Sequence, residues 1–156
     1  MDEKKIQKYA VDYLSKYDSS KKNLSDVIKR KIFRLNISGQ EKRKLINHID
    51  RVLSNLEKNN LLNDQRYCNS KIASLSIRGK SRSFIFNYLL KKGIDKFEIQ
   101  DNLNLFENNN NNWELNSAKI FAKKKNIIKS KDSYEKKLAK IARAGFSYEI
   151  CKKILN

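Results

Sequence analysis

Apolar residues recur along the chain at intervals of three and four positions, the spacing that places them on one face of an α-helix. One such stripe lies between Glu41 and Lys58, and similar stretches occur along the rest of the chain. No segment alternates apolar and polar residues for long between turn residues, and the chain contains no proline. The pattern therefore predicts an all-α protein, with helices over Ile6–Leu14, Asn23–Leu35, Glu41–Lys58, Asp64–Leu75, Phe84–Leu90, Phe97–Phe106, Leu115–Ala122, Leu138–Ala142 and Tyr148–Leu155.

Three glycines, Gly39, Gly93 and Gly145, each follow a helical stripe, where a residue with a left-handed backbone often ends a helix. Gly93 and Gly145 are each followed by an apolar residue and then by an aspartate or a serine, which are good N-caps. A serine, Ser81 or Ser133, lies 12 residues before each of these two glycines. The two segments therefore match at an offset of 52 residues.

A similar pattern begins at Ser20, so the repeat extends to the N-terminal third of the chain. Repeats of about this length are typical of stacked helical modules. We expect three tandem three-helix repeats, over residues 1–62, 63–107 and 108–156, forming an elongated, curved helical array. The joint before the third repeat is the polar run Asn108–Asn112, which we expect to be a flexible loop.

Charge is the strongest signal in the composition. The 156 residues include 35 Lys and Arg against 17 Asp and Glu, a net charge of +18. Such a field attracts polyanions, so nucleic acid, or a protein bound to nucleic acid, is the expected partner. The chain is also crowded with Lys, Asn and Ile, the residues of A/T-rich codons, and genome composition is an alternative source of part of the lysine excess.

No run of about 18 apolar residues is present, so we expect no membrane span. The N-terminus, Met1–Lys5, leads into an amphipathic stretch instead of the apolar core of a signal peptide. We expect a cytoplasmic protein.

The cysteines, the histidine and one glycine-containing turn give no catalytic or metal-binding pattern. Cys68 and Cys151 each lie on the apolar stripe of a helix, which is typical of buried thiols. Gly79-Lys80-Ser81 resembles the end of a P-loop, but Ser74 stands where that loop needs a glycine, and a helical pattern precedes it. His48 is the only histidine. We expect neither an enzyme nor a cofactor or metal, and interpret Ser81 as an N-cap.

Surface positions supply the candidate binding residues. In the first repeat, Phe33 points away from its helix's core stripe, among the cations Lys29 and Arg30. An exposed aromatic beside cations suits a protein interface or base stacking, although packing against the next repeat is an alternative. In the second repeat the cations Arg78, Lys80 and Arg82 surround Gly79, where they would hold phosphate or an acidic loop, or simply be solvated.

A second apolar seam, Phe86 with Leu90, lies opposite the stripe Phe84, Ile85, Tyr88 and Leu89 on the same predicted helix. Apolar residues on both sides indicate a helix that is covered on both sides. We expect burial between repeats, with an exposed partner site as the alternative. The lysine runs 123–125 and 136–137 are interpreted as solvated charge.

Three motifs resemble those of the RecX family of regulatory proteins. Residues 56–68 resemble L-x-x-x-G-x-L-D-D-x-R-F-A, and residues 79–94 resemble G-x-S-x-x-x-I-x-x-x-L-x-x-K-G-I. Residues 143–150 are similar to R-R-G-F-S-Y-D-x-I. Order, spacing and total length match, and the motifs contain the residues that we expect to be structural, which are Asp64, Arg66, Gly93, Gly145 and Phe146. Asp64 suits a helix N-terminus, with Arg66 as its candidate partner.

The chain also departs from the family pattern. The family's first unit carries R-x-R-S-x-x-E-L, whereas residues 17–24 lack both arginines and the glutamate. Asn60 replaces a glycine, and Ala144 replaces the second arginine of the third motif. Contacts that the family makes through those residues are therefore not carried over to this chain.

The resemblance implies a regulator that lies along the helical groove of the RecA–DNA filament. We expect the chain to be a monomer. There it would inhibit filament growth and the ATPase, strand-exchange and co-protease activities of RecA. The filament- or DNA-binding candidates are Lys29, Arg30, Phe33, Arg78, Lys80, Arg82 and Arg143. Weak, electrostatic contact with single- or double-stranded DNA is expected as well. The alternative is a general nucleic-acid-binding helical protein without a specific protein partner.

Overall fold

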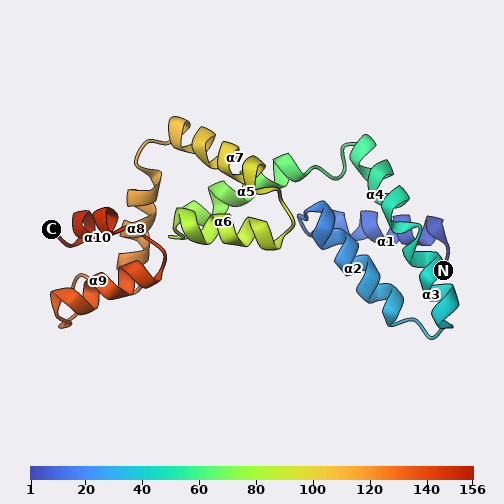
Figure 1. The fold of residues 1–156 in the computed structure, drawn as a ribbon, viewed down its shortest axis with the longest axis horizontal. Coiled ribbons are helices and arrows are strands. Elements are labelled where there is room, and N and C mark those ends of the chain that lie inside the picture. Colours follow the sequence, from blue (N-terminus) through green and yellow to red (C-terminus); the bar gives the residue numbers. More distant parts are fainter. The chain divides into compact units, whose positions relative to one another are not determined.

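The computed structural model describes all 156 residues and contains ten α-helices and no strand (Figure 1). The all-α prediction is therefore confirmed. The helices are α1 (Glu3–Lys16), α2 (Lys21–Phe33), α3 (Gly39–Ile46), α4 (Ile49–Lys58), α5 (Asp64–Ser76), α6 (Arg82–Lys91), α7 (Lys96–Asn109), α8 (Trp113–Lys124), α9 (Tyr134–Arg143) and α10 (Tyr148–Leu155).

Two compact units make up the chain, Met1–Tyr67 and Cys68–Asn156. The segment 1–62 contains four helices where the apolar pattern predicts three, because the stripe between Glu41 and Lys58 is divided. Helix α3 ends at Ile46 with Asn47 as its C-cap, and α4 begins after His48. Asparagine competes with helical hydrogen bonding through its own side chain, which makes Asn47 a favourable place for the break. The division into three repeats stays a prediction.

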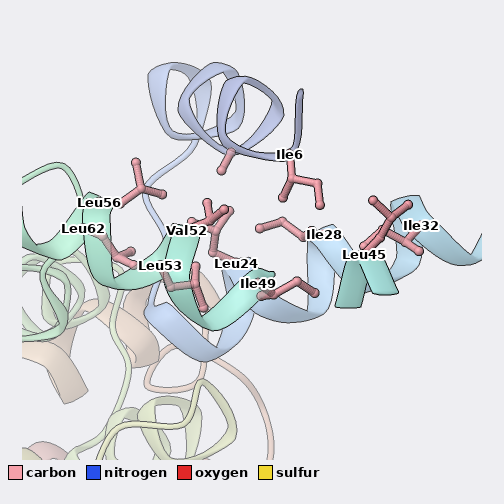
Figure 2. Packing of buried hydrophobic residues seen from close by; sticks show 11 residues of the cluster. Ile6, Leu24, Ile28, Ile32, Leu45, Ile49, Val52, Leu53, Leu56 and Leu62 are labelled. Carbon is pink, nitrogen blue, oxygen red and sulfur yellow. The ribbon is translucent and has the colours of Figure 1, made fainter. Parts of the chain in front are cut away.

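The first unit is held together by apolar side chains from all four of its helices (Figure 2). Helix α2 contributes Leu24, Ile28 and Ile32, which are at most 1% exposed and lie at four-residue intervals on one face. The other members of the cluster are Ile6, Ala10, Leu45, Ile49, Val52, Leu53, Leu56 and Leu62. Each fully buried Leu or Ile contributes about 1.5–3 kcal/mol relative to an exposed position, so this face of α2 is fixed toward the core.

Helices α8, α9 and α10 form a second core, in the C-terminal part of the chain. The rings of Phe121 and Phe146 lie 5.9 Å apart there, and Cys151 is fully buried beside them. Burial raises the pKa of the Cys151 thiol. Cys68 is also fully buried, and both cysteines are free, which confirms their interpretation as core residues.

Left-handed residues end several helices. Gly93 has a φ of 81° and Gly145 a φ of 99°, as the repeated glycine pattern predicts. The residue after each packs inward, with Ile94 3% and Phe146 4% exposed. The expectation for Gly39 is wrong, because Gly39 is the first residue of α3, whose N-cap is Ser38. The sequence Ser38-Gly39 follows a helix but starts the next one, since the serine hydroxyl accepts from the N–H of Glu41.

The predicted asparagine loop is shorter than expected. Helix α7 continues through Asn109, and the turn is closed by a hydrogen bond from the N–H of Trp113 to the carbonyl of Asn110. Trp113 is 5% exposed, packs edge-on against Phe106 and donates from Nε1 to Glu107. The buried tryptophan holds this turn to α7, which the polar character of the run 108–112 did not indicate.

Candidate functional site

The first candidate surface lies on α2, opposite the core face of that helix. The hydroxyl of Ser20 caps α2 by accepting from the N–H of Asn23, and the apolar stripe fixes which face is buried. Phe33, in the last turn, is 58% exposed, and its carbonyl accepts from Nζ of Lys42 at 2.9 Å. Arg30 is exposed and Lys29 is half-buried. The structure therefore presents an aromatic ring with several cations around it.

The second candidate surface is the turn between α5 and α6. Gly79 is buried with a φ of 85°, and an added Cβ would lie 3.0 Å from the backbone nitrogen of Phe121. The turn is therefore packed closely on α8. Ser81 is fully buried and caps α6 by accepting from the N–H of Phe84, as the sequence predicts. Because helix α5 precedes this turn, the P-loop interpretation is excluded.

Arg82 is tied to neighbouring helices. Its guanidinium donates to Asn104 at 2.7 Å and lies 3.8 Å from Glu107, both on α7. Its backbone N–H donates to Oε2 of Glu114 on α8 at 2.8 Å. Because partners distant in sequence engage Arg82, we expect its removal to affect the fold. Arg78 is exposed and Lys80 half-buried, and they remain the available cations of this turn.

Glu114 is held in an unusual environment for a carboxylate. Burial raises its pKa above the ordinary value of 4.5, while the hydrogen bond from the backbone of Arg82 and the charge of Arg82 lower it. Burial has the larger effect. The side chain therefore serves as a partly desolvated acceptor at the N-terminus of α6.

Helix α2 has an equivalent arrangement in the first unit. Oδ1 of Asp64, the first residue of α5, accepts from the backbone N–H of Lys21 at 2.8 Å. Asp64 is thus an acid in a first helical turn, as predicted, but it also binds a second helix. The suggested pairing with Arg66 is wrong, since the Arg66 guanidinium donates to the carbonyl and the side chain of Asn60.

The third candidate, Arg143, is exposed in the last turn of α9, where its Nε donates to the carbonyl of Ala139. The carbonyl of the next residue after Arg143, Ala144, accepts a hydrogen bond from the hydroxyl of Ser81 at 3.0 Å. The structure therefore brings the turn after Arg143 to the N-terminus of α6. Sequence analysis also missed Lys124, whose Nζ donates to the carbonyl of Arg78 at 3.2 Å and which adds an exposed cation to the second surface.

The exposed faces of α6 differ from the prediction. Its core residues are Ile85 and Leu89, which are fully buried. Phe84, expected within the core stripe, is 40% exposed, and Leu90 is 39% exposed. Phe86 is half-buried and lies in a shallow pocket with Arg82, Gln100 and Gly145 among its lining residues. The second seam is therefore only partly covered.

Metal-binding geometry was not found anywhere in the chain, since no three His, Cys, Asp or Glu side chains are grouped to hold an ion. None of the ten helices has both the length and the apolar character needed to cross a membrane. His48 is the residue that precedes α4, and its side chain makes no capping hydrogen bond.

Comparison with known proteins shows what the chain is similar to. No protein-family model matches the chain. The chain is 28% identical to the regulatory protein RecX of Myxococcus xanthus (strain DK1622) over 159 residues, which cover 97% of this chain and 84% of that protein. A crystal structure of RecX from Lactobacillus salivarius has a TM-score of 0.71 at 26% identity and covers 98% of this chain and 94% of its own. The chain is thus similar to RecX proteins over nearly its whole length.

Further RecX proteins are also similar to the chain. The RecX of Streptococcus gordonii is 32% identical over 105 residues, which are 67% of this chain and 40% of the relative. The chain thus spans less than half the length of that longer RecX protein. A further crystal structure of a regulatory protein RecX has a TM-score of 0.70 at 22% identity, which supports the fold.

Two departures from the RecX motifs now have a structural explanation. Asn60, where the motif has a glycine, has a φ of 60°, a left-handed conformation that asparagine tolerates better than most residues. Its successor donates to the carbonyl of Leu56, closing the same kind of turn that glycine provides. Ala144, where the motif has a second arginine, contributes through its carbonyl to Ser81, and this contact does not depend on the side chain.

Proposed function

We propose that the chain binds the RecA–DNA filament and inhibits the recombinase, ATPase and co-protease activities of RecA. The observation that carries the proposal is the similarity to a RecX protein over 97% of the chain. The coarser conclusion, a regulatory protein of the RecX family, stands on that comparison. The RecA filament as target is the proposal. It implies a cytoplasmic protein, because RecA works on chromosomal DNA.

The charge of the chain supports this partner. A RecA filament is assembled on a polyanion, and a body with a net charge of +18 is attracted to such an assembly over distances up to a Debye length. Charge alone speeds encounter and does not select RecA. Selectivity needs contacts with protein, and exposed aromatic residues are the usual anchors of protein interfaces.

Phe33 is the best such anchor in the first unit. Its ring is 58% exposed although it lies at the end of a helix whose other apolar residues are buried. Arg30, one turn earlier, is exposed. We propose that Phe33 and Arg30, with Lys29, contact RecA, while Arg78, Lys80 and Lys124 contact acidic groups or DNA phosphates. Arg143 is the corresponding candidate on α9. We assign Arg82 a structural role, because residues of α7 and α8 engage it.

The test combines inhibition with folding controls. A double variant, Arg30→Glu with Phe33→Ala, should inhibit the DNA-dependent ATPase of RecA at least about tenfold more weakly, since a buried aromatic anchor is worth about 2 kcal/mol or more. Its melting temperature should stay close to that of the parent, because the residues lie outside the core. Lys58→Glu, a charge reversal of an exposed lysine on α4, is the matched control and should inhibit like the parent. Parent-like inhibition by the double variant would remove α2 from the interface.

The high net charge favours a second function, general nucleic-acid binding without a specific protein partner. In that case inhibition of RecA would follow only from competition for DNA. The single variant Phe33→Ala separates the two, because it removes no charge. A loss of inhibition in proportion to the loss of bare DNA binding supports the general binder.

A further inference from the structure

An uncharged groove lies on the surface that α5, α7 and α8 share. It consists of two hollows, of about 190 Å³ and 270 Å³, and Phe106 of α7 lines both of them. Asparagines border the groove on all three helices, so we call it the amide groove. The residues that define it are Asn69, Leu105 and Asn109 in the first hollow, Ile77 and Asn116 in the second, and Phe106 between them.

The amide groove contains no charged side chain. None of the residues that line either hollow is Asp, Glu, Lys or Arg, although 33% of the chain is charged. A polyanion needs cations along its path, and this groove supplies none. Charge is also depleted at the centres of protein interfaces, because an ion loses its hydration there. Charge complementarity therefore favours an uncharged occupant.

Apolar side chains of the groove are exposed to solvent. Ile77 is 73% exposed, more than any other large apolar residue of the chain, and Leu105 is 55% exposed. Between them the ring of Phe106 packs edge-on against that of Trp113, which is 5% exposed, with 5.5 Å between the ring centroids. An exposed apolar patch with a polar border is typical of a site for another protein. The packed rings give the second hollow a wall that is already in place.

The asparagines determine which form of protein chain fits. A primary amide both donates and accepts hydrogen bonds, so it matches the N–H and C=O groups of a peptide backbone. Asn69, Asn109 and Asn116 are exposed at the border of the groove, one on each of the three helices. A bound helix has already used its backbone groups within itself, whereas an extended segment offers them to a neighbour.

The two hollows agree with an extended occupant. Alternate side chains of an extended segment point to the same side, about 6.6 Å apart along the backbone. Two such side chains would enter the two hollows on either side of Phe106. The side chain between them would point to solvent, so the groove sets no requirement for that position.

We propose that the amide groove docks an extended, uncharged segment of another protein. Two apolar side chains at alternate positions fill the hollows, and Asn69, Asn109 and Asn116 bond to the backbone of the segment. This interaction goes beyond inhibition of RecA. It is tested in the absence of RecA and DNA, so its failure and the failure of the RecA proposal are separate results.

Selection from a random peptide library displayed on phage, with the full chain immobilised, tests the proposal. The enriched peptides should lack net charge and carry two large apolar residues separated by one position. The enriched peptide that binds most tightly is then synthesised with a fluorescent label, and its affinity is measured by anisotropy. A version with N-methylated backbone between the two apolar residues keeps both side chains and should bind at least about fivefold more weakly.

Variants of the chain locate the peptide in the groove. The pair Ile77→Lys with Leu105→Lys places charge in both hollows and should lower the affinity for the peptide at least about tenfold. Phe97→Lys is the matched control, because Phe97 is an exposed apolar residue of α7 outside the groove, at 68% exposure. It should bind the peptide like the parent.

The amides give a second readout that adds no charge. Asn69→Ala with Asn109→Ala removes two hydrogen-bonding side chains and should weaken binding at least about fivefold. Asn108→Ala, which changes an exposed asparagine of α7 outside the groove, should bind like the parent. Because all these positions are exposed, melting temperatures should stay close to that of the parent. The alanine pair keeps the test valid if the lysine pair fails to fold.

Four results would overturn the proposal. They are a selection that enriches nothing over the lysine pair used as bait, enrichment of acidic peptides, apolar residues four positions apart in a peptide that becomes helical on binding, and peptide affinity that survives both groove variants. Sedimentation of the chain alone tests a second copy as the occupant. A dimer that the lysine pair dissociates would assign the groove to self-association and would also contradict the proposal.

Discussion

The backbone N–H of Arg82 donates to Oε2 of Glu114 at 2.8 Å, across a separation of 32 residues. The N–H of Lys21 and Oδ1 of Asp64 form the same relationship at 2.8 Å in the other unit. In both cases the first N–H of a serine-capped helix meets a carboxylate from the first turn of a later helix. Helix N-termini favour such anions, so these bonds join helices that no apolar pattern would pair.

Asp64→Ala should destabilise the chain by about 1–3 kcal/mol, because the N–H of Lys21 loses a charged acceptor. Asp64→Asn keeps an acceptor atom and should lose less. Asp50→Ala is the control, since Asp50 is also an acid in a first helical turn and is exposed. Thermal melting measures all three. Equal losses for Asp64→Ala and Asp50→Ala would mean that only the helix dipole matters.

The raised pKa of Glu114 predicts a pH-dependent contribution to stability. The folded chain holds this proton more tightly than the unfolded chain, so the contribution is fully present below the ordinary pKa of 4.5 and is lost as the pH rises through the higher folded pKa. Glu114→Gln should remove this dependence. Near neutral pH we expect Glu114→Gln to be at least as stable as the parent, and Glu114→Ala to be less stable because Arg82 loses its acceptor. Melting curves of the parent and both variants, recorded from below pH 4.5 to neutral pH, test this dependence. A parent-like pH profile in Glu114→Gln would assign the dependence to other groups.

The chain's glycines should respond differently to the same substitution. Gly145→Ala should be strongly destabilising, because φ is 99° and the new Cβ would overlap Oγ of Ser81. Gly93→Ala should cost roughly 1–2 kcal/mol for the left-handed backbone alone. Gly39→Ala should raise stability by about 0.4–1 kcal/mol, since nothing lies within 4 Å of the added Cβ. Chemical denaturation of the three variants tests this order, and a destabilised Gly39→Ala would contradict it.

Charge reversal separates the two arginines of the α5–α6 turn. Arg78→Glu changes an exposed side chain and should alter stability by no more than about 0.5 kcal/mol. Arg82→Glu sets a third carboxylate beside Glu107 and Glu114 and should lower the melting temperature clearly. Binding assays on Arg78→Glu are therefore interpretable directly. Equal melting temperatures for the two variants would show that the Arg82 contacts add nothing to stability.

The sequence contains enough information for the helices and many of their ends. Stripes such as that of Leu24, Ile28 and Ile32 determine a buried face, and the caps Ser20, Ser81 and Ser133 depend on bonds within four residues. Local chemistry also misleads where two signals coincide, as at Gly39, which follows one helix and starts another.

The apolar pattern along the sequence does not predict the contacts between helices. Arg82 was interpreted as a surface cation because its partners, Asn104, Glu107 and Glu114, lie 22 to 32 residues away. Phe84 belongs to the apolar spacing of α6, but its ring is 40% exposed, because the core accepts only the narrower face of Ile85 and Leu89. Spacing along one helix does not reveal which neighbours cover it.

The central claim, inhibition of RecA through the filament, is tested most directly by titrating the chain into the DNA-dependent ATPase of RecA at increasing salt. Electrostatic DNA binding weakens steeply with salt, so a concentration exists at which the chain no longer binds bare DNA. The proposal predicts that the ATPase rate still falls on addition of the chain at that salt concentration. Inhibition that disappears together with bare DNA binding would contradict it and identify the chain as a general nucleic-acid-binding protein.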